Sequence, residues 1–309
     1  MTTLDLPALD GRKPLGFLAA LGLTRLLTVR DDSPARLSWS PGSSSALLDS
    51  EHNTVDEIVG RLEAIIDSIP AEGVLPGVPV HFPPPGAAPD GLRLPPRDLR
   101  SLVNRLSVNP ELPYRELDAW ISSLVTDLCC DEKGRSAISL MAAPSGKQSM
   151  RTMLEKPLSA VRFDRKVLHE ALTEWRRYPG VTGEYLDHQV LFDAVDSGSG
   201  QSEERGVPGA TWLALMAYPL LRTTAQGSDP VTTGWYREGG RPPRFVWPLW
   251  SRPLDCHAIV ALLEHPTLSQ CANGLPISGM AGLSVFSIYS AQRRRIAGRT
   301  FAGVLGPIP

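Results

Sequence analysis

The sequence has few cysteines, little net charge and no long uninterrupted apolar run. Its 309 residues include 4 cysteines, two of them adjacent, so no disulfide framework is indicated. The formal net charge is −2, so the molecule as a whole does not attract nucleic acid or anionic lipid. The longest apolar runs reach about a dozen residues, short of the roughly 20 that span a bilayer. The start of the chain does not have the pattern of a signal peptide. We therefore expect a cytoplasmic protein with reduced thiols.

Short catalytic signatures are also missing. The sequence contains no GxxxxGKS or GxxxxGKT, no GxGxxG after a strand, no HExxH and no GxSxG. These absences argue against an autonomous ATPase, a Rossmann oxidoreductase, a zincin and an α/β-hydrolase. We expect neither a cofactor nor a resident metal.

The patterns that are present predict an α+β fold of mixed helices and mostly antiparallel strands. Helical spacing of apolar residues predicts an amphipathic helix over 53–69, capped by Asn53 or Thr54. The proline-rich segment Phe82–Asp98 predicts a loop, and helices are expected at Arg97–Leu106 and Tyr114–Leu128. The segments "VTTGWYRE" and "PRFVWPLW" predict a β-hairpin.

Two similar apolar segments predict buried helices. They are "PLGFLAALGLTRLL" (Pro14–Leu27) and "GATWLALMAYPLLR" (Gly209–Arg222). One interpretation is two related halves, 1–195 and 209–309, each opened by a buried apolar helix and joined by a flexible linker at 196–208. The alternative is a chance match between Leu-Ala-rich helices.

Two basic segments are candidates for nucleic-acid contact. "APSGKQSMR" combines a Pro-Ser-Gly turn with side-chain donors, and "SAQRRRIAGR" groups arginines without an acid. The candidate residues are Lys147, Gln148, Arg151, Arg293, Arg294, Arg295 and Arg299. On a strand, Arg293 and Arg295 would share one face and Arg294 the other. The alternative interpretation is an ordinary solvated connection and a basic strand edge.

Three other groups have both a functional and a structural interpretation. Tryptophans 235, 247 and 250 are candidates for a protein interface, although such aromatic density is also typical of a core. An acid/base or metal site could use Glu184, Asp187, His188 and Asp193, which also suit a loop with solvated acids. A zinc site would use Cys256, His257, His265 and Cys271, but their spacing fits no standard finger.

Several of these segments resemble a known family. "DGRKPLGFLAALGLTRLLT" resembles the N-terminal signature of CRISPR-associated proteins of the type I-G (formerly I-U) systems. "GATWLALMAYPLLR", "VWPLWSRPL" and "SGKQSM" are similar to later segments of these proteins. The resemblance is to a large-subunit-like protein or to the extension family that accompanies the helicase–nuclease.

This resemblance implies a non-enzymatic subunit of an RNA-guided antiviral complex. Its partners would be effector-complex subunits or the helicase–nuclease, with guide RNA or target DNA held through local basic patches. Two alternatives remain open: a protein–protein adaptor that binds no nucleic acid, and a metal-dependent hydrolase.

Overall fold

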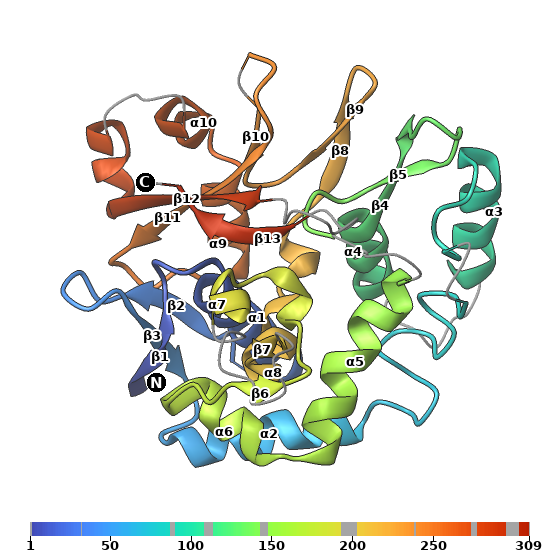
Figure 1. The fold of residues 1–309 in the computed structure, drawn as a ribbon. Helices are drawn as coiled ribbons and strands as arrows, with labels where there is room; N and C mark the ends of the chain where they lie inside the picture. The colour runs from blue at the N-terminus through green and yellow to red at the C-terminus, as the bar shows by residue number, and fades with distance from the viewer. Residues whose placement is uncertain are drawn as a thin grey trace.

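The computed structural model describes residues 2–31, 33–86, 90–107, 114–142, 148–192, 203–237, 239–272, 277–294 and 303–308. Over these residues the chain has the predicted α+β class, and every strand pairing within them is antiparallel. A three-stranded sheet lies near the N-terminus and a four-stranded sheet near the C-terminus, as Figure 1 shows.

The N-terminal part forms the three-stranded sheet and two helices. Its elements are β1 (Thr2–Asp10), α1 (Pro14–Arg30), β2 (Arg36–Trp39), β3 (Ser45–Ser50) and α2 (Val55–Asp67), with sheet order β1-β3-β2. Thr54 caps α2 by accepting a hydrogen bond from the backbone N–H of Glu57, as one of the two expected caps. Sequence patterning missed β1, which contains Pro7. A proline is tolerated there because β1 is an edge strand, and its register shifts between Leu6 and Asp10.

The middle of the chain consists of helices and short strand pairs. Its elements are α3 (Pro96–Ser107), α4 (Tyr114–Leu124), β4 (Val125–Cys130), β5 (Ser136–Ile138), α5 (Met150–Phe163), α6 (Lys166–Thr173), β6 (Tyr178–Pro179), the 3-10 helix η1 (Gly183–Tyr185), α7 (Gln189–Phe192) and β7 (Arg205–Gly206). Helix α4 ends at Leu124, earlier than predicted, because the chain continues as strand β4 and pairs with β5.

The C-terminal part holds the second sheet, of order β10-β11-β12-β13. Its elements are α8 (Pro208–Met216), η2 (Tyr218–Leu220), β8 (Thr223–Gln226), β9 (Asp229–Thr232), β10 (Trp235–Tyr236), β11 (Arg244–Trp250), α9 (Cys256–Leu263), α10 (Pro266–Ala272), η3 (Ile277–Leu283), β12 (Val285–Arg294) and β13 (Val304–Pro307). The predicted hairpin is confirmed as β10–β11, with Trp235 opposite Phe245.

The two apolar helices are buried, as predicted, but they pack against each other in one core. A Cβ built on Gly22 of α1 would lie 1.7 Å from the carbonyl oxygen of Leu213 in α8. Glycine at this position therefore permits a backbone contact that any side chain would block. One buried apolar cluster extends from Leu6 to Leu305 and includes residues of both helices, so the idea that each helix fills a core of its own is wrong. The division of the chain into two halves, joined by a linker at 196–208, stays a prediction.

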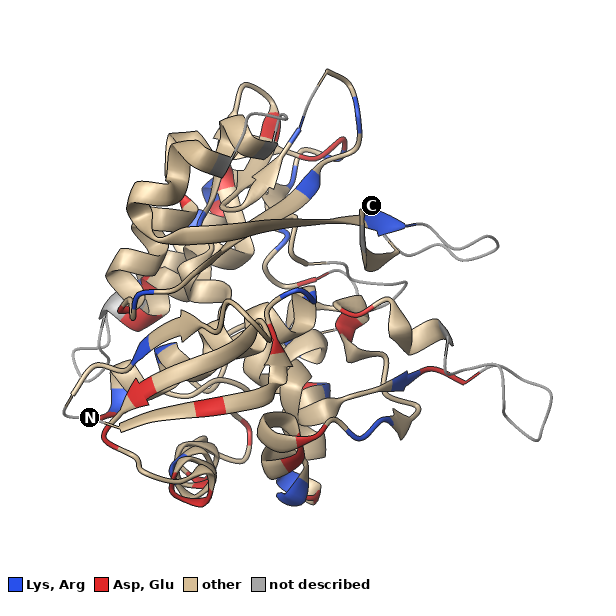
Figure 2. Cartoon of the chain, turned by 90° about the vertical axis from the view of Figure 1, so that its left-hand side faces the viewer, with Lys and Arg blue, Asp and Glu red and all other residues tan. Residues whose placement is uncertain are grey.

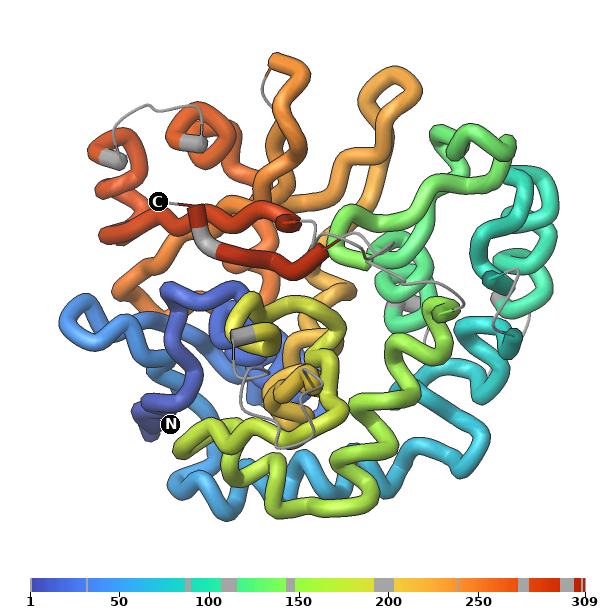
Figure 3. Tube along the Cα trace, in the orientation of Figure 1, coloured from blue at the N-terminus to red at the C-terminus, as the bar shows by residue number. Residues whose placement is uncertain are grey.

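Two of the three candidate interface tryptophans belong to this core. Trp247 and Trp250 are 0% exposed, and their rings surround Phe17 of α1. The Trp247 Nε1 donates to the Gly11 carbonyl at 2.7 Å, and the Trp250 Nε1 donates to the Leu37 carbonyl at 2.7 Å. The interface expectation is wrong for these two residues, because their polar atoms and ring faces contact this chain. Figure 3 shows the resulting closeness of the blue N-terminal segment to the orange C-terminal segment.

In Figure 2, Lys and Arg positions are interspersed with Asp and Glu positions along the ribbon, and neither sign fills one side of this view. Of the helices described, none has the length and apolar character needed to cross a membrane.

Candidate functional site

The structure separates the candidate nucleic-acid residues into three groups. Lys147, Arg295 and Arg299 lie outside the described residues, as does Asp193 of the acidic set. Gln148, Arg151 and Arg293 contact groups of this chain, and Arg294 is exposed at the end of β12.

Arg151 binds the proline-rich segment. Its Nη1 donates to the carbonyls of Val80 at 3.1 Å and Pro83 at 3.0 Å, and its Nη2 donates to the carbonyl of Glu72. This guanidinium therefore anchors a loop to helix α5. The expected phosphate contact is not supported for Arg151, because three of its donor bonds go to main-chain carbonyls.

Residues from three separate motifs meet beside η1. The Gln148 Nε2 donates to the Glu184 Oε2 at 2.7 Å. Arg293 reaches the same region from β12, and its two terminal nitrogens donate to the carbonyls of Met141 at 2.6 Å and Gly303 at 3.0 Å. The direct phosphate contact expected of Arg293 is therefore replaced, at both terminal nitrogens, by contacts to this chain. We call Gln148, Glu184 and Arg293 the Glu184 cluster.

Burial controls the ionisation of this cluster. Glu184 is 7% exposed, and burial raises its pKa to about 7, although Gln148, Lys156 and Arg293 act in the opposite direction. Burial also lowers the pKa of Arg293 to about 10, against the influence of Tyr218 and Glu184. Near neutral pH, the carboxyl group of Glu184 therefore keeps its proton more readily than that of an exposed glutamate.

The backbone around Glu184 is unusual. Gly183, Glu184 and Tyr185 have φ values of 59°, 49° and 56°, so three consecutive residues occupy the left-handed region. That region costs an L-residue roughly 1–3 kcal/mol, and the surrounding structure must compensate. Tyr185 does so in part by packing against Val190 and Val304.

The remaining candidates for acid/base or metal chemistry have structural partners. Asp187 accepts a hydrogen bond from the Arg177 Nη2 at 2.6 Å and another from the backbone N–H of Gln189 at 3.0 Å. Burial lowers the pKa of His188, although the Asp187 charge opposes this. Asp187 thus orients the start of α7.

Metal-ligand geometry is found elsewhere in the described part of the chain. There, Asp31, Glu51 and His52 form a set of three possible ligands, whose ligand atoms lie within 4.8 Å of one another. Arg61 already donates to the Asp31 Oδ1 at 2.6 Å, which offsets the charge a cation would use. Neither the candidate zinc ligands nor the described acids near η1 form such a set.

A larger concave site lies beside the hairpins. Figure 1 shows β4–β5, β8–β9 and β10 extending from the same side of the molecule. Between them is a cavity of about 940 Å³, which we call the hairpin hollow. Four cationic side chains line it: Arg93, Lys133, Arg135 and Arg293.

Two of these cations are held by an acid. Asp131 accepts hydrogen bonds from the Nη2 atoms of Arg93 and Arg135, each at 2.7 Å. Burial alone would raise the pKa of Asp131, but the hydrogen bonds from Arg135 and Arg93 hold it well below its ordinary value. Lys133 is exposed and makes no ion pair within the described residues. Among the cations that line the hairpin hollow, Lys133 can therefore bind a ligand without breaking an existing ion pair.

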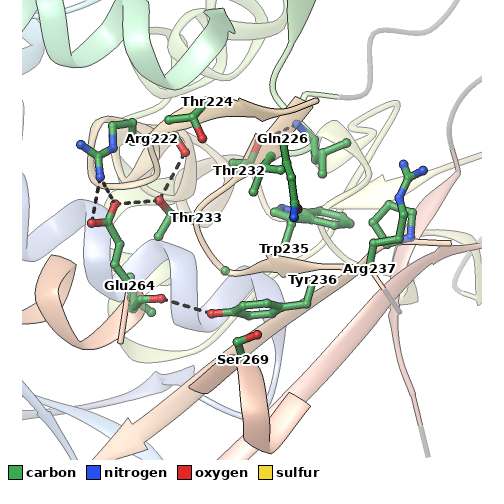
Figure 4. Close-up of a pocket in the computed structure, with 15 residues that line it drawn as sticks. Arg222, Thr224, Gln226, Thr232, Thr233, Trp235, Tyr236, Arg237, Glu264 and Ser269 are labelled. Carbon is green, nitrogen blue, oxygen red and sulfur yellow. Dashed lines mark hydrogen bonds and ion pairs between the residues drawn. The ribbon is translucent and has the colours of Figure 1, made fainter. Parts of the chain in front are cut away.

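A second cavity, of about 450 Å³, adjoins the hairpin hollow (Figure 4). We call it the tyrosine pocket. The Tyr236 ring lies on one side, with its hydroxyl donating to the Leu263 carbonyl at 3.4 Å. Directly after Leu263, the Glu264 carboxylate accepts two 3.0 Å hydrogen bonds from the Arg222 Nη2 and one from the Thr233 hydroxyl at 3.2 Å.

Trp235 connects the two cavities. It lines both of them, as do Leu140 and Pro243, while remaining 4% exposed. Its Nε1 donates to the Met141 Sδ at 2.9 Å. Arg293 donates to the carbonyl of the same methionine, so Trp235 and Arg293 contact one residue. Of the three candidate tryptophans, Trp235 is thus the one at the surface of a cavity.

Sequence reasoning did not find the hairpin hollow or the tyrosine pocket. Their linings come from segments between Arg93 and Arg293 that carry no shared motif. The available signal was the predicted hairpin, where Tyr236 and Arg237 follow Trp235 directly.

Comparison with known proteins assigns no family to this arrangement. No protein-family model matches the chain, and a search of curated proteins found no match.

Proposed function

We propose that this chain is a non-enzymatic subunit of a type I-G CRISPR antiviral complex that contacts nucleic acid through the hairpin hollow. The choice of complex rests on the resemblance carried by Pro14–Thr28 and by the segments near Gly209 and Trp247. The choice of surface rests on geometry and charge.

The observation that carries this proposal is the position of Arg293. This residue belongs to the arginine cluster singled out in the sequence, and it lines the hairpin hollow together with Arg93, Lys133 and Arg135. Among the described residues lining the hollow and the tyrosine pocket, six are cationic and four are acidic. A local excess of positive charge on a chain of net charge −2 favours contact with a phosphate backbone.

The candidate residues take different roles in this proposal. Arg294 and Lys133 supply exposed charge for phosphates, whereas Arg293, Gln148 and Arg151 position the surrounding backbone. Lys147, Arg295 and Arg299 stay proposed phosphate contacts.

The test is salt-dependent binding of the full chain to a labelled oligonucleotide, followed by fluorescence anisotropy. Each phosphate contact contributes about one unit to the slope of log affinity against log salt. We expect Lys133→Ala and Arg294→Ala each to reduce this slope by about one unit. The matched control is Arg36→Ala, which removes an exposed arginine of β2 in the other sheet.

The outcomes separate the proposal from its alternatives. Equal slopes for the wild type and both variants would remove these residues from the site. A chain that binds no nucleic acid, alone or with its operon partners, would contradict the proposal as a whole.

A protein–protein adaptor is the second candidate, and exposed apolar side chains favour it. Phe163 at the end of α5 is 94% exposed, and Leu128 of β4 is 64% exposed. Leu128 borders a cavity of about 360 Å³ lined mainly by α3, α4 and β4. Binding of operon partners that survives nuclease treatment and is lost in Leu128→Glu would support the adaptor.

A further inference from the structure

The hairpin hollow and the tyrosine pocket are adjacent cavities, and we call the pair the trough. They share Leu140, Trp235 and Pro243 as lining residues, so a ligand that passes Trp235 contacts both cavities. Individual cavities of about 940 and 450 Å³ have the size of sites for small organic molecules. Both cavities are too small to hold a folded domain.

The partly exposed Tyr236 ring offers a flat apolar face to the tyrosine pocket, whereas Trp235 is 4% exposed and forms part of the wall. The Tyr236 ring is held by its hydrogen bond to the Leu263 carbonyl, and Trp235 is held by its bond to Met141. Pro242 and Pro243 line the same space from the β10–β11 turn. Nucleobases stack on such faces irrespective of sequence, and each stacked base contributes about 1–3 kcal/mol.

The polar groups of the tyrosine pocket suit the edge of a base. Thr224 and Gln226 line this pocket, so a hydroxyl and an amide that both donate and accept hydrogen bonds are available there (Figure 4). The Thr233 hydroxyl lines it too but already contacts Glu264. The Arg222 Nη2 already donates to both carboxylate oxygens of Glu264, so the two charges offset each other at this end of the pocket. A phosphate would therefore avoid this end and lie toward Arg237, the exposed cation that lines the same pocket.

Two exposed cations lie along the trough. Lys133 stands on the β4–β5 turn, and Arg237 follows β10. Arg237 is 3.6 Å from Asp229, with side chains 50% and 60% exposed, and an exposed pair of this kind contributes little and can be exchanged for a phosphate.

We infer that the trough holds an unpaired, single-stranded segment of nucleic acid, with one base in the tyrosine pocket against Tyr236 and phosphates at Arg237 and Lys133. This inference rests on the proposed function and specifies its ligand. A duplex does not fit the same surface, because its bases are inside the stack. Extracting one base costs a few kcal/mol.

The experiment compares a 12-nucleotide oligo-dT with a 12-base-pair duplex on the full chain, by fluorescence anisotropy at one salt concentration. We expect the single strand to bind at least about tenfold more tightly than the duplex. Tyr236→Leu and Arg237→Ala should each weaken single-strand binding about tenfold, through lost stacking and a lost phosphate contact respectively. Arg36→Ala serves again as the control, with binding equal to that of the wild type.

A second readout locates the base. Ultraviolet crosslinking of an oligonucleotide carrying 5-iodouridine should place the adduct on the peptide that contains Trp235 and Tyr236. Arg237 is exposed, so Arg237→Ala keeps the test valid if Tyr236→Leu lowers stability.

The outcomes distinguish this inference from the proposed function. Equal affinity for single strand and duplex, or single-strand binding unchanged in both variants with the crosslink elsewhere, overturns the trough as a single-strand site and leaves nucleic-acid binding in place. Absence of binding to either oligonucleotide overturns both. Protection of the hairpins by a protein partner, with no nucleic acid bound, assigns the trough to the adaptor instead.

Discussion

Glu184 is the residue whose environment departs furthest from that of an ordinary surface acid. It is buried, it accepts a hydrogen bond from Gln148, and it lies within a left-handed stretch of backbone. A buried carboxylate pays a desolvation cost, and the protein reduces that cost by keeping the proton. The protonation state of Glu184 should therefore affect the stability of the fold.

We predict that the stability contributed by Glu184 is lost as the pH rises from about 4.5 to about 7. The folded-state pKa of about 7 exceeds the ordinary value of 4.5, so in this window the folded chain holds a proton that the unfolded chain has released. Glu184→Gln removes this dependence. The variant should be more stable than the wild type at pH 8 by an amount on the order of 3 kcal/mol, and equal to it near pH 4.

Urea unfolding at pH 4, 5, 6, 7 and 8 measures this difference. Glu155→Gln is the control, because Glu155 is an exposed acid on the neighbouring helix α5. If the wild type and Glu184→Gln keep the same stability difference at every pH, Glu184 is not buried with a raised pKa.

Residue types were easier to recognise in the sequence than the contacts they make. Gln148, Glu184 and Arg293 were all singled out, but for two different purposes and in three separate motifs. The structure brings them together because the Gln148 amide donates to Glu184, and Arg293 of β12 lies close enough to act on the Glu184 pKa. Nothing in the local sequence specifies that long-range contact, so the hydrogen bonds of Arg293 to main-chain carbonyls were not predicted.

Helices α1 and α8 are the elements that organise the core. Both are apolar on nearly all sides, and small residues let their backbones approach each other. Gly22 marks the closest approach, since a built Cβ would also lie 3.0 Å from the backbone nitrogen of Ala217. A backbone contact of this kind cannot be relieved by a change of rotamer.

We predict that Gly22→Ala destabilises the protein by about 3 kcal/mol or more, because α1 and α8 must separate to admit the methyl group. The matched control is Gly60→Ala in α2, where a Cβ meets no atom within 4 Å. Gly60→Ala should stabilise the protein by about 0.5–1 kcal/mol, through helix propensity alone.

Chemical denaturation of both variants checks this pair. The close packing of the two helices would be contradicted if Gly22→Ala unfolded at the same urea concentration as the wild type.

Within the described residues, one large apolar cluster connects the N-terminal and C-terminal parts of the chain. Backbone hydrogen bonds of 2.9 Å run in both directions between Leu37 and Leu254, so the N-terminal sheet touches the segment after β11. The tryptophan contacts to Gly11 and Leu37 add further links across the chain. Parts that share a core are expected to unfold together.

We predict a single cooperative unfolding transition for the full chain. Far-ultraviolet circular dichroism and tryptophan fluorescence should give coincident urea curves, because helices and buried tryptophans belong to the same apolar cluster. Two separated transitions would instead support independent halves divided near 196–208.

The sequence by itself determined the α+β class, the burial of two apolar helices, the cap of α2 and the β10–β11 hairpin. These features depend on neighbours within a few residues, where periodicity, capping and turn chemistry act directly. Only the tertiary structure decided that the two helices share one core, that Trp247 and Trp250 face inward, and that Arg293 lines a hollow between hairpins. Those outcomes depend on which distant surfaces exclude water from each other, and a local pattern of residue types does not specify that pairing.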